Sequence, residues 1–165
     1  MSLKKNQIFE TTIESLSSGV AHVEGQAVFV PGAAPGDVIR CRIVKALKSY
    51  AFGRIDAILA PGPGRVAPDC AVCTPCGGCG LRHLSYATEC EAKTDFVRDA
   101  FARLGGFDVS SFEFSPVLAL TDHTAHYRNK VQLPVGLDAD GHVVTGFYAG
   151  RTHRIVPCPD CRLQP

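Results

Sequence analysis

The sequence predicts a mainly β protein with one helix, which places it in the α+β class. Three observations predict this. Between residues 8 and 59, apolar and polar side chains alternate in short runs separated by turn residues. Residues 86–104 instead carry apolar side chains at three- and four-residue spacing, as helices do. Four cysteines within ten residues, and a pair near the end, mark a cysteine-cluster region outside the first strands.

Composition sets the limits of size and environment. The 165 residues are 45% apolar and 20% charged, which is typical of globular chains with one domain or two small ones. No apolar run approaches a membrane span, and residues 1–7 lack the apolar core of a secretory signal. Eight cysteines without such a signal indicate reduced thiols, so we expect a cytoplasmic protein with no membrane partner.

Five short strands are expected in the first sixty residues. A two-residue connection, Glu24-Gly25, predicts a hairpin, and Pro31–Asp37 is dense in turn residues. The expected strands are Ile8–Leu16, Val20–Val23, Gln26–Val30, Val38–Lys45 and about Tyr50–Leu59. Five such strands with tight turns and no helix predict a small closed barrel of the OB kind over residues 1–60.

The fourth of these strands has a clear inside and outside. Alternation turns Ile39, Cys41 and Ile43 inward and Arg40 and Arg42 outward. OB barrels often bind single-stranded nucleic acid through basic and aromatic side chains. Basic residues lie near Tyr50 and Phe52 in the sequence, namely Arg40, Arg42, Lys45, Lys48 and Arg54. A simply solvated charged face explains the same residues, and the sequence pattern leaves both interpretations open.

The cysteine run begins after a linker, residues 61–69, whose prolines and glycines exclude helix and central strand. Glycines at 77, 78 and 80 let the backbone turn so that several sulfurs can face one centre. The clustered cysteines are Cys70, Cys73, Cys76 and Cys79, with Cys158 and Cys161 close to the chain end. This spacing predicts a soft-metal or iron–sulfur site, against the alternative of small buried apolar side chains. Of the histidines, only the adjacent His83 is a plausible ligand, and we favour the alternative that it is a partly exposed polar residue.

A single helix is expected from Tyr86 to Leu104. Ser85 can cap its start, and Gly105-Gly106 stops it. Its apolar stripe comprises Phe96, Val97, Ala100, Phe101 and Leu104. Cys90, inside this helix, is predicted to pack and not to bind metal.

A small antiparallel sheet is expected in the last third of the chain. Its strands are Val131–Val135, Val143–Tyr148 and His153–Val156, with a turn at Asp138–Gly141. Folding of this meander should return Cys158 and Cys161 to the first cysteine run.

Residues 18–37, Ser-Gly-Val-Ala-His-Val-Glu-Gly-Gln-Ala-Val-Phe-Val-Pro-Gly-Ala-Ala-Pro-Gly-Asp, resemble a TRAM domain, an OB-like RNA-binding module. Taken in order, the whole chain resembles the RNA (uracil-5-)-methyltransferase family. The further segments that carry this resemblance are Cys70-x₅-Cys76-Gly-Gly-Cys79, the helix with Lys93, Tyr127–Lys130, Gly146–Tyr148 and His153-x-Ile-Val-x₄-Cys161.

The resemblance implies a metal centre. In the family, three cysteines spaced x₅ and x₂, with a fourth far downstream, hold a 4Fe–4S cluster. Carried over, the metal ligands are Cys70, Cys76, Cys79 and Cys161. Cys73 and Cys158 exceed the pattern, so Cys158 could replace Cys161, and a zinc site of Cys76, Cys79, Cys158 and Cys161 stays open.

The resemblance also implies a larger enzyme. Family members add a Rossmann-like domain that binds S-adenosylmethionine and supplies the cysteine nucleophile, and these 165 residues show neither. We therefore interpret the chain as the RNA-binding and iron–sulfur part of such an enzyme, an incomplete fragment that is catalytically silent alone. The expected partner is RNA, with ribosomal RNA placed before tRNA. The expected RNA contacts are Arg40, Arg42, Lys45, Lys48, Arg128 and Lys130.

Two further expectations remain. The helix 86–104 would pack on the methyltransferase domain in the family, so without that cover we expect it either to lie on another surface or to mediate self-association through its apolar stripe. A ferredoxin-like electron carrier is an alternative function, which the sequence disfavours because the cysteine run lacks the x₃-Cys-Pro ending.

Overall fold

A computed structural model describes residues 3–15, 19–121 and 123–165. The expected end of the first strand at Leu16, and the break at Ser17-Ser18, lie outside these residues. The chain divides into two compact units by its internal contacts. One comprises Met1–Val66 and His83–Leu118, and the other Ala67–Arg82 and Ala119–Pro165. The expected domain limits at residues 60 and 70 stay a prediction.

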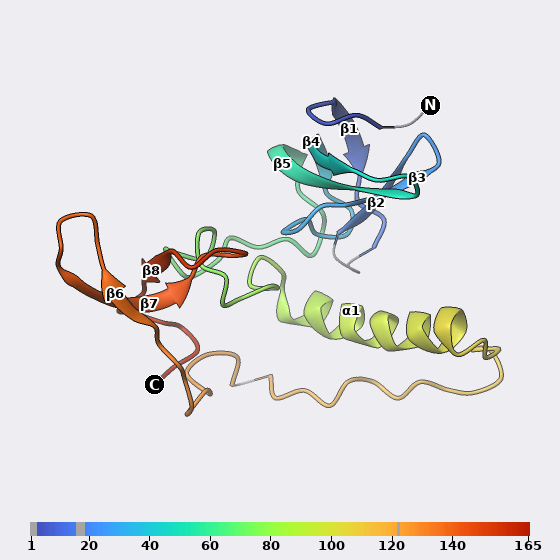
Figure 1. Cartoon of the computed structure of the whole chain (residues 1–165). Helices are drawn as coiled ribbons and strands as arrows, with labels where there is room; N and C mark the ends of the chain where they lie inside the picture. The colour runs from blue at the N-terminus through green and yellow to red at the C-terminus, as the bar shows by residue number, and fades with distance from the viewer. Residues whose placement is uncertain (1–2, 16–18, 122) are drawn as a thin grey trace. The chain divides into compact units, whose positions relative to one another are not determined.

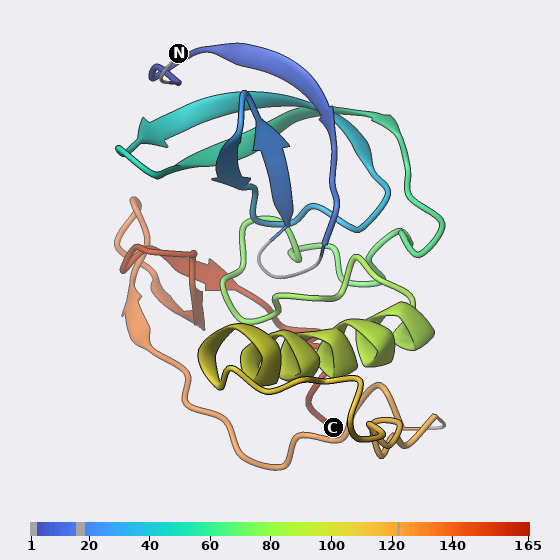
Figure 2. The same cartoon turned by 90° about the vertical axis from the view of Figure 1, so that its right-hand side faces the viewer.

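Five strands in the first unit form the predicted barrel (Figure 1). They are β1 Ile8–Thr12, β2 Val20–Val23, β3 Gln26–Phe29, β4 Val38–Ala46 and β5 Tyr50–Ala60. Their order is β1-β4-β5-β3-β2, with β3 and β5 parallel and the other pairs antiparallel. A bridge between Ser15 and Val20 joins the chain after β1 to β2 and closes the ring. Both views show β4 and β5 running together around the barrel (Figures 1 and 2).

Alternation fills the barrel interior as predicted. Ile39, Cys41 and Ile43 are fully buried, whereas Arg40 is exposed. Burial raises the pKa of the Cys41 thiol to about 11, with a further contribution from the charge of Asp56. The interior is tight beside it, since a Cβ on Gly53 would lie 2.3 Å from the Cys41 sulfur. The β2–β3 hairpin turns at Glu24 and Gly25, both with positive φ, which matches the twist of its strands.

One buried ion pair joins the barrel to the segment that leads into the helix. The Asp37 carboxylate is fully buried and accepts hydrogen bonds from the amides of Ala34 and Gly62. The Arg65 guanidinium also donates to it, with the closest N–O distance 2.7 Å. Burial acts most strongly on the pKa of Asp37 and would raise it. The Arg65 hydrogen bond and the two amides outweigh burial, so this pKa lies below its ordinary value.

Residues 64–66 lie alongside residues 83–85 and so determine where the helix begins. Val66 donates to the carbonyl of His83, and Ser85 donates to the carbonyl of Gly64. The Ser85 hydroxyl accepts from the amide of Thr88, which confirms the predicted cap. Helix α1 spans Tyr86–Asp99.

The helix continues to Leu104 as expected, but its last turn is not α-helical. Residues Ala100–Leu104 form a π-helix, η1, in which the amide of Gly105 bonds to the carbonyl of Ala100, five residues earlier. The chain then folds back, and the Phe101 ring contacts those of Phe107, Phe112 and Phe114 at centroid distances of 5.6 to 5.8 Å. Phe96 and Leu104 remain 64% and 88% exposed. The apolar stripe therefore packs only in part.

The second unit contains a three-stranded antiparallel sheet with the order β6-β7-β8. The strands are β6 Val135–Leu137, β7 Val143–Tyr148 and β8 Ile155–Pro157. The expected first strand, Val131–Val135, is therefore wrong except for its last residue. Pro134 has no N–H to donate to a neighbouring strand. The pairing register of β6 with β7 is set by the turn that follows β6. In that turn, the Asp138 carboxylate accepts from the amides of Asp140 and His142.

The end of β7 holds the first cysteine segment. Cys76 forms a bridge with Ala149, and the amide of Gly77 donates to the carbonyl of Tyr148 at 3.0 Å. A Cβ on Gly77 would lie 2.7 Å from that carbonyl oxygen, so only glycine fits there.

None of the helices within residues 3–15, 19–121 and 123–165 has the length and apolar character that a membrane span requires.

Replacing Asp37 by Asn should lower the free energy of unfolding by about 3–5 kcal/mol, since it leaves Arg65 without its buried anion. Because the pKa of Asp37 is depressed in the folded state, its contribution is complete above its unfolded pKa of about 3.9. The contribution is lost as pH falls through the folded pKa. Urea denaturation between neutral and acidic pH measures both effects. Glu10→Gln, which breaks the exposed pair with Arg40, is the control and should cost about 0–1 kcal/mol.

Replacing Gly77 by Ala should destabilise the second unit by about 1–3 kcal/mol, because its Cβ would force the cysteine segment off β7. Gly80→Ala is the matched control, as a Cβ there meets nothing within 4 Å. Thermal unfolding of both variants followed by circular dichroism makes the comparison. Equal midpoints for the two variants would contradict the close approach at Gly77.

Candidate metal centre

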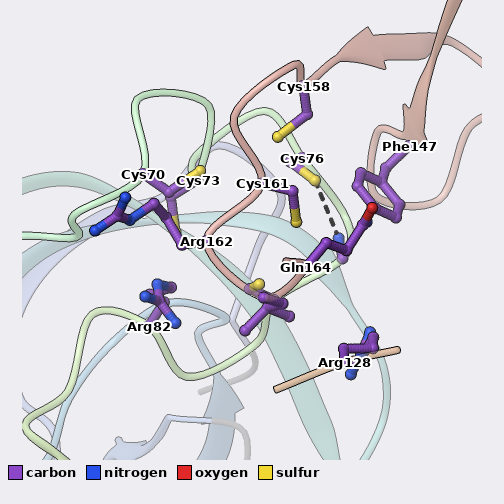
Figure 3. A pocket seen from close by; sticks show the side chains of 13 residues that line it. Cys70, Cys73, Cys76, Arg82, Arg128, Phe147, Cys158, Cys161, Arg162 and Gln164 are labelled. Carbon is purple, nitrogen blue, oxygen red and sulfur yellow. Dashed lines mark hydrogen bonds between the residues drawn. The ribbon is translucent and has the colours of Figure 1, made fainter. Parts of the chain in front are cut away.

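Six thiols from two distant segments line one pocket of the second unit. The cysteines labelled in Figure 3 come from the loop between residues 70 and 79 and from the loop after β8. The six are Cys70, Cys73, Cys76, Cys79, Cys158 and Cys161. The structure thus brings together all four predicted ligands and the two additional cysteines. The other two cysteines, Cys41 and Cys90, belong to the first unit.

Backbone turns set the direction of these side chains. The amide of Cys73 donates to the carbonyl of Cys70, and that of Cys76 donates to the carbonyl of Val72. The amide of Gly78 donates to the sulfur of Cys76 at 3.4 Å, the dashed line in Figure 3. N–H···S bonds of this kind stabilise a thiolate when it binds a metal.

Without a cation, three of these thiols resist ionisation. Burial raises the pKa of Cys158 to about 12, with further contributions from Cys161, Cys70 and Cys76. Burial and then the neighbouring Cys70 raise the pKa of Cys73, and burial and then Cys73 raise that of Cys79. A negative charge on one of these sulfurs therefore disfavours the ionisation of its neighbours Cys73, Cys79 and Cys158. A bound cation removes this repulsion, which is the electrostatic requirement of a metal site.

The six sulfurs do not form a compact set around one point. Among the described residues, no three of these sulfurs all lie within 4.8 Å of one another. Four thiolates around one zinc ion at about 2.3 Å lie roughly 3.8 Å apart. Thiolates that each bind a different iron of one cluster lie farther apart. A single tetrahedral zinc ion would therefore require four of these sulfurs to move closer together.

Charged residues that the sequence analysis did not assign to this pocket flank the thiols. Arg82, Arg128 and Arg162 line the same pocket. Asp69 accepts from Arg82 at 2.7 Å and from Arg162 at 3.5 Å, and this acid raises the pKa of Arg82. The signal was their sequence position, because Asp69 directly precedes Cys70 and Arg162 directly follows Cys161.

His83 lies outside the pocket. It belongs to the first unit, where its Nε2 lies 3.4 Å from the carbonyl oxygen of Ala33. Burial lowers its pKa, so the imidazole is neutral at physiological pH. A second group of potential ligands, Asp138, Asp140 and His142, forms the exposed turn after β6.

The predicted RNA contacts divide into paired and unpaired cations. Arg40 is paired with Glu10, and the Nε of Arg42 donates to Asp56 at 2.8 Å. Lys45 and Lys48 are exposed and form no ion pair with any residue that the structure describes. In the second unit, Arg128 lines the thiol pocket and Lys130 is exposed.

Comparison with known proteins extends this description. Residues 3–55 match the family model of the TRAM domain. The chain is 38% identical over 165 residues to a Halalkalibacterium halodurans protein described as an uncharacterized RNA methyltransferase. Proteins with that description from Clostridium tetani and Listeria monocytogenes are 39% and 40% identical. Each match covers 98% of this chain and 35% of the relative, so the chain spans about a third of their length.

A solved structure shares the fold. It is the crystal structure of the Pyrococcus abyssi tRNA (uracil-54, C5)-methyltransferase in complex with S-adenosyl-L-homocysteine, with a TM-score of 0.57 and 23% sequence identity. The similarity covers 92% of this chain and 31% of that one. The chain is therefore similar to a TRAM domain over residues 3–55 and, over nearly its whole length, to part of bacterial proteins described as RNA methyltransferases.

Proposed function

We propose that this chain is the RNA-binding and 4Fe–4S-binding part of an S-adenosylmethionine-dependent RNA (uracil-5-)-methyltransferase. The observation that carries the proposal is the convergence of six thiols in one pocket, in a chain that also contains a TRAM domain. Ribosomal RNA is the proposed substrate of the whole enzyme, with tRNA as the alternative. The name of the Pyrococcus abyssi protein, which shares the fold, supports the uracil C5 chemistry.

The proposed cluster ligands are Cys70, Cys76, Cys79 and Cys161. The fit rests on the donor set, because thiolates are the ligands that iron–sulfur clusters take. It also rests on the N–H···S bond to Cys76. A bound cluster would supply a covalent link between the two cysteine segments. Zinc held by Cys76, Cys79, Cys158 and Cys161 is the alternative that the experiment below excludes or supports.

The flanking arginines fit this role. Four thiolates and a cluster carry net negative charge, and Arg82 lies close enough to act on the ionisation of Cys73 and Cys79. Asp69 holds the Arg82 guanidinium in place through both carboxylate oxygens. Arg82 therefore acts as a fixed counter-charge for the thiolates, oriented by Asp69.

Methyl transfer itself is proposed for the longer protein. Relatives are about three times the length of this chain, since the chain covers 35% of each. We propose that S-adenosylmethionine binding and the attack on uracil reside in that additional length. This chain then serves to bind RNA and to hold the cluster.

Anaerobically purified protein should be brown and contain iron. Replacing Cys70, Cys76, Cys79 or Cys161 singly by Ser should remove most of the iron and destabilise the second unit, because cluster binding is coupled to folding. Cys73→Ser is the matched control from the same loop and should retain the iron. Visible absorbance and metal analysis measure these outcomes. Colourless protein with stoichiometric zinc would overturn the cluster assignment. Loss of iron in Cys158→Ser but not in Cys161→Ser would identify Cys158, and not Cys161, as the fourth ligand.

Self-association through the helix is a further prediction. The exposed apolar side chains of α1 and η1 should pair two copies, since covering each large side chain contributes about 1.5–3 kcal/mol. Phe96→Glu should shift the protein to monomer in multi-angle light scattering; it is a cleaner change than Phe101→Glu, because Phe101 packs on other rings. Val143→Glu, at a site 70% exposed in the second unit, is the control. Monomeric wild-type protein at high concentration contradicts the prediction.

A further inference from the structure

Three aromatic rings gather on the outside of the barrel. The ring centroids of Phe29, Tyr50 and Phe52 lie 5.6 to 5.8 Å from one another. The Tyr50 ring is nearly perpendicular to both phenylalanines, at 79° and 83°. We call these three residues the aromatic patch.

The barrel does not need these rings for its core. The neighbours of Phe29 and Phe52 in sequence point inward, and Val28 and Ala51 are fully buried. Phe29 and Phe52 are direct partners in the β3–β5 pair, so they share the outer face, and Tyr50 lies two residues before Phe52 on that face. Large aromatic side chains placed together outside a complete core are typical of a binding surface.

Two cations border the aromatic patch. Lys45 is the direct partner of Phe52 in the β4–β5 pair, so its side chain lies on the same outer face. Lys48 lies in the turn that leads into Tyr50. Both are exposed and form no ion pair with the residues that the structure describes, whereas the neighbouring Arg42 and Arg54 both pair with Asp56.

We propose that the aromatic patch is a stacking platform for the unpaired bases of single-stranded RNA, with Lys45 and Lys48 contacting the adjacent phosphates. The inference rests on the proposed RNA-binding function and assigns it to specific residues. Aromatic rings can stack on the bases of a single-stranded nucleic acid, and the neighbouring free cations can contact its phosphates. A base that stacks on one ring would meet the edge of the perpendicular one. Paired bases in a duplex do not expose these faces, so the platform selects unpaired strands.

The test measures binding of the full chain to fluorescein-labelled oligouridylate of about ten nucleotides, within the site sizes of OB folds. Tyr50→Leu and Phe52→Leu keep apolar bulk but remove the flat ring, and each should weaken binding by about 5- to 100-fold. Tyr50→Phe keeps the ring and should bind like wild type. Ile58→Ala, at an exposed position of β5 outside the patch, is the control and should also leave binding unchanged.

The charge component has its own readout. Lys45→Gln with Lys48→Gln should flatten the log–log salt dependence by about 1.4, from about 0.7 for each phosphate contact to a single strand. Lys93→Gln with Arg103→Gln removes the same charge from the helix and should leave the slope unchanged. An abasic oligomer of equal length should bind wild type and Tyr50→Leu equally, because it has no base to stack.

The outcomes separate this inference from the proposed function. Wild-type binding that the two leucine variants leave unchanged overturns the platform but leaves RNA binding by the chain intact. Absence of binding to both oligouridylate and a duplex at low salt overturns the proposed RNA-binding function as well. If the leucine variants instead convert a dimer to a monomer without affecting RNA binding, the patch is a protein interface and the platform is overturned. Equal thermal midpoints for all variants show that each remains folded.

Discussion

The buried pair of Asp37 and Arg65 is the contact on which the first unit depends. Asp37 closes the turn before β4 through the amide of Ala34 and fixes the chain after β5 through the amide of Gly62. Arg65 then positions residues 64–66, against which residues 83–85 pair before α1 begins. A carboxylate at zero exposure is tolerated only because five hydrogen bonds surround it. The barrel and the start of the helix therefore meet through one charged group.

The barrel could be predicted from the sequence because its signals are local. The alternation of apolar and polar residues identifies strands, and residues that favour positive φ, such as glycine, identify hairpin turns. Neither signal requires knowledge of which strands pair. The inward direction of Ile39, Cys41 and Ile43 and the cap at Ser85 followed from the same local rules, and the structure confirms them. The prediction of a strand at Val131–Val135 was wrong, because the register of β6 depends on the turn that follows it in the chain.

The remaining features depend on partners that are distant in sequence. Nothing local to Arg40 indicates that Glu10, thirty residues away, neutralises it. The π-helical end of the helix accompanies the return of the chain onto Phe101. The spacing of apolar residues within the helix gives no information about this return. At the thiol pocket, cysteine spacing predicted a metal site, but it did not predict the arginines around the thiols, two of which Asp69 binds.

The two-segment construction of the thiol pocket also affects how the protein is made. Cys161 emerges from the ribosome about 80 residues after Cys79, which corresponds to roughly 4–16 s of synthesis. During that interval the nascent chain presents four thiols with neither their last partner nor the strand β7 that holds their loop. Those thiols are open to stray metals and oxidants for seconds. Cys41, by contrast, is already enclosed once β4 and β5 have formed the barrel. Under the proposed metal binding, translation speed and the supply of metal to the emerging chain therefore influence which ion the pocket takes up.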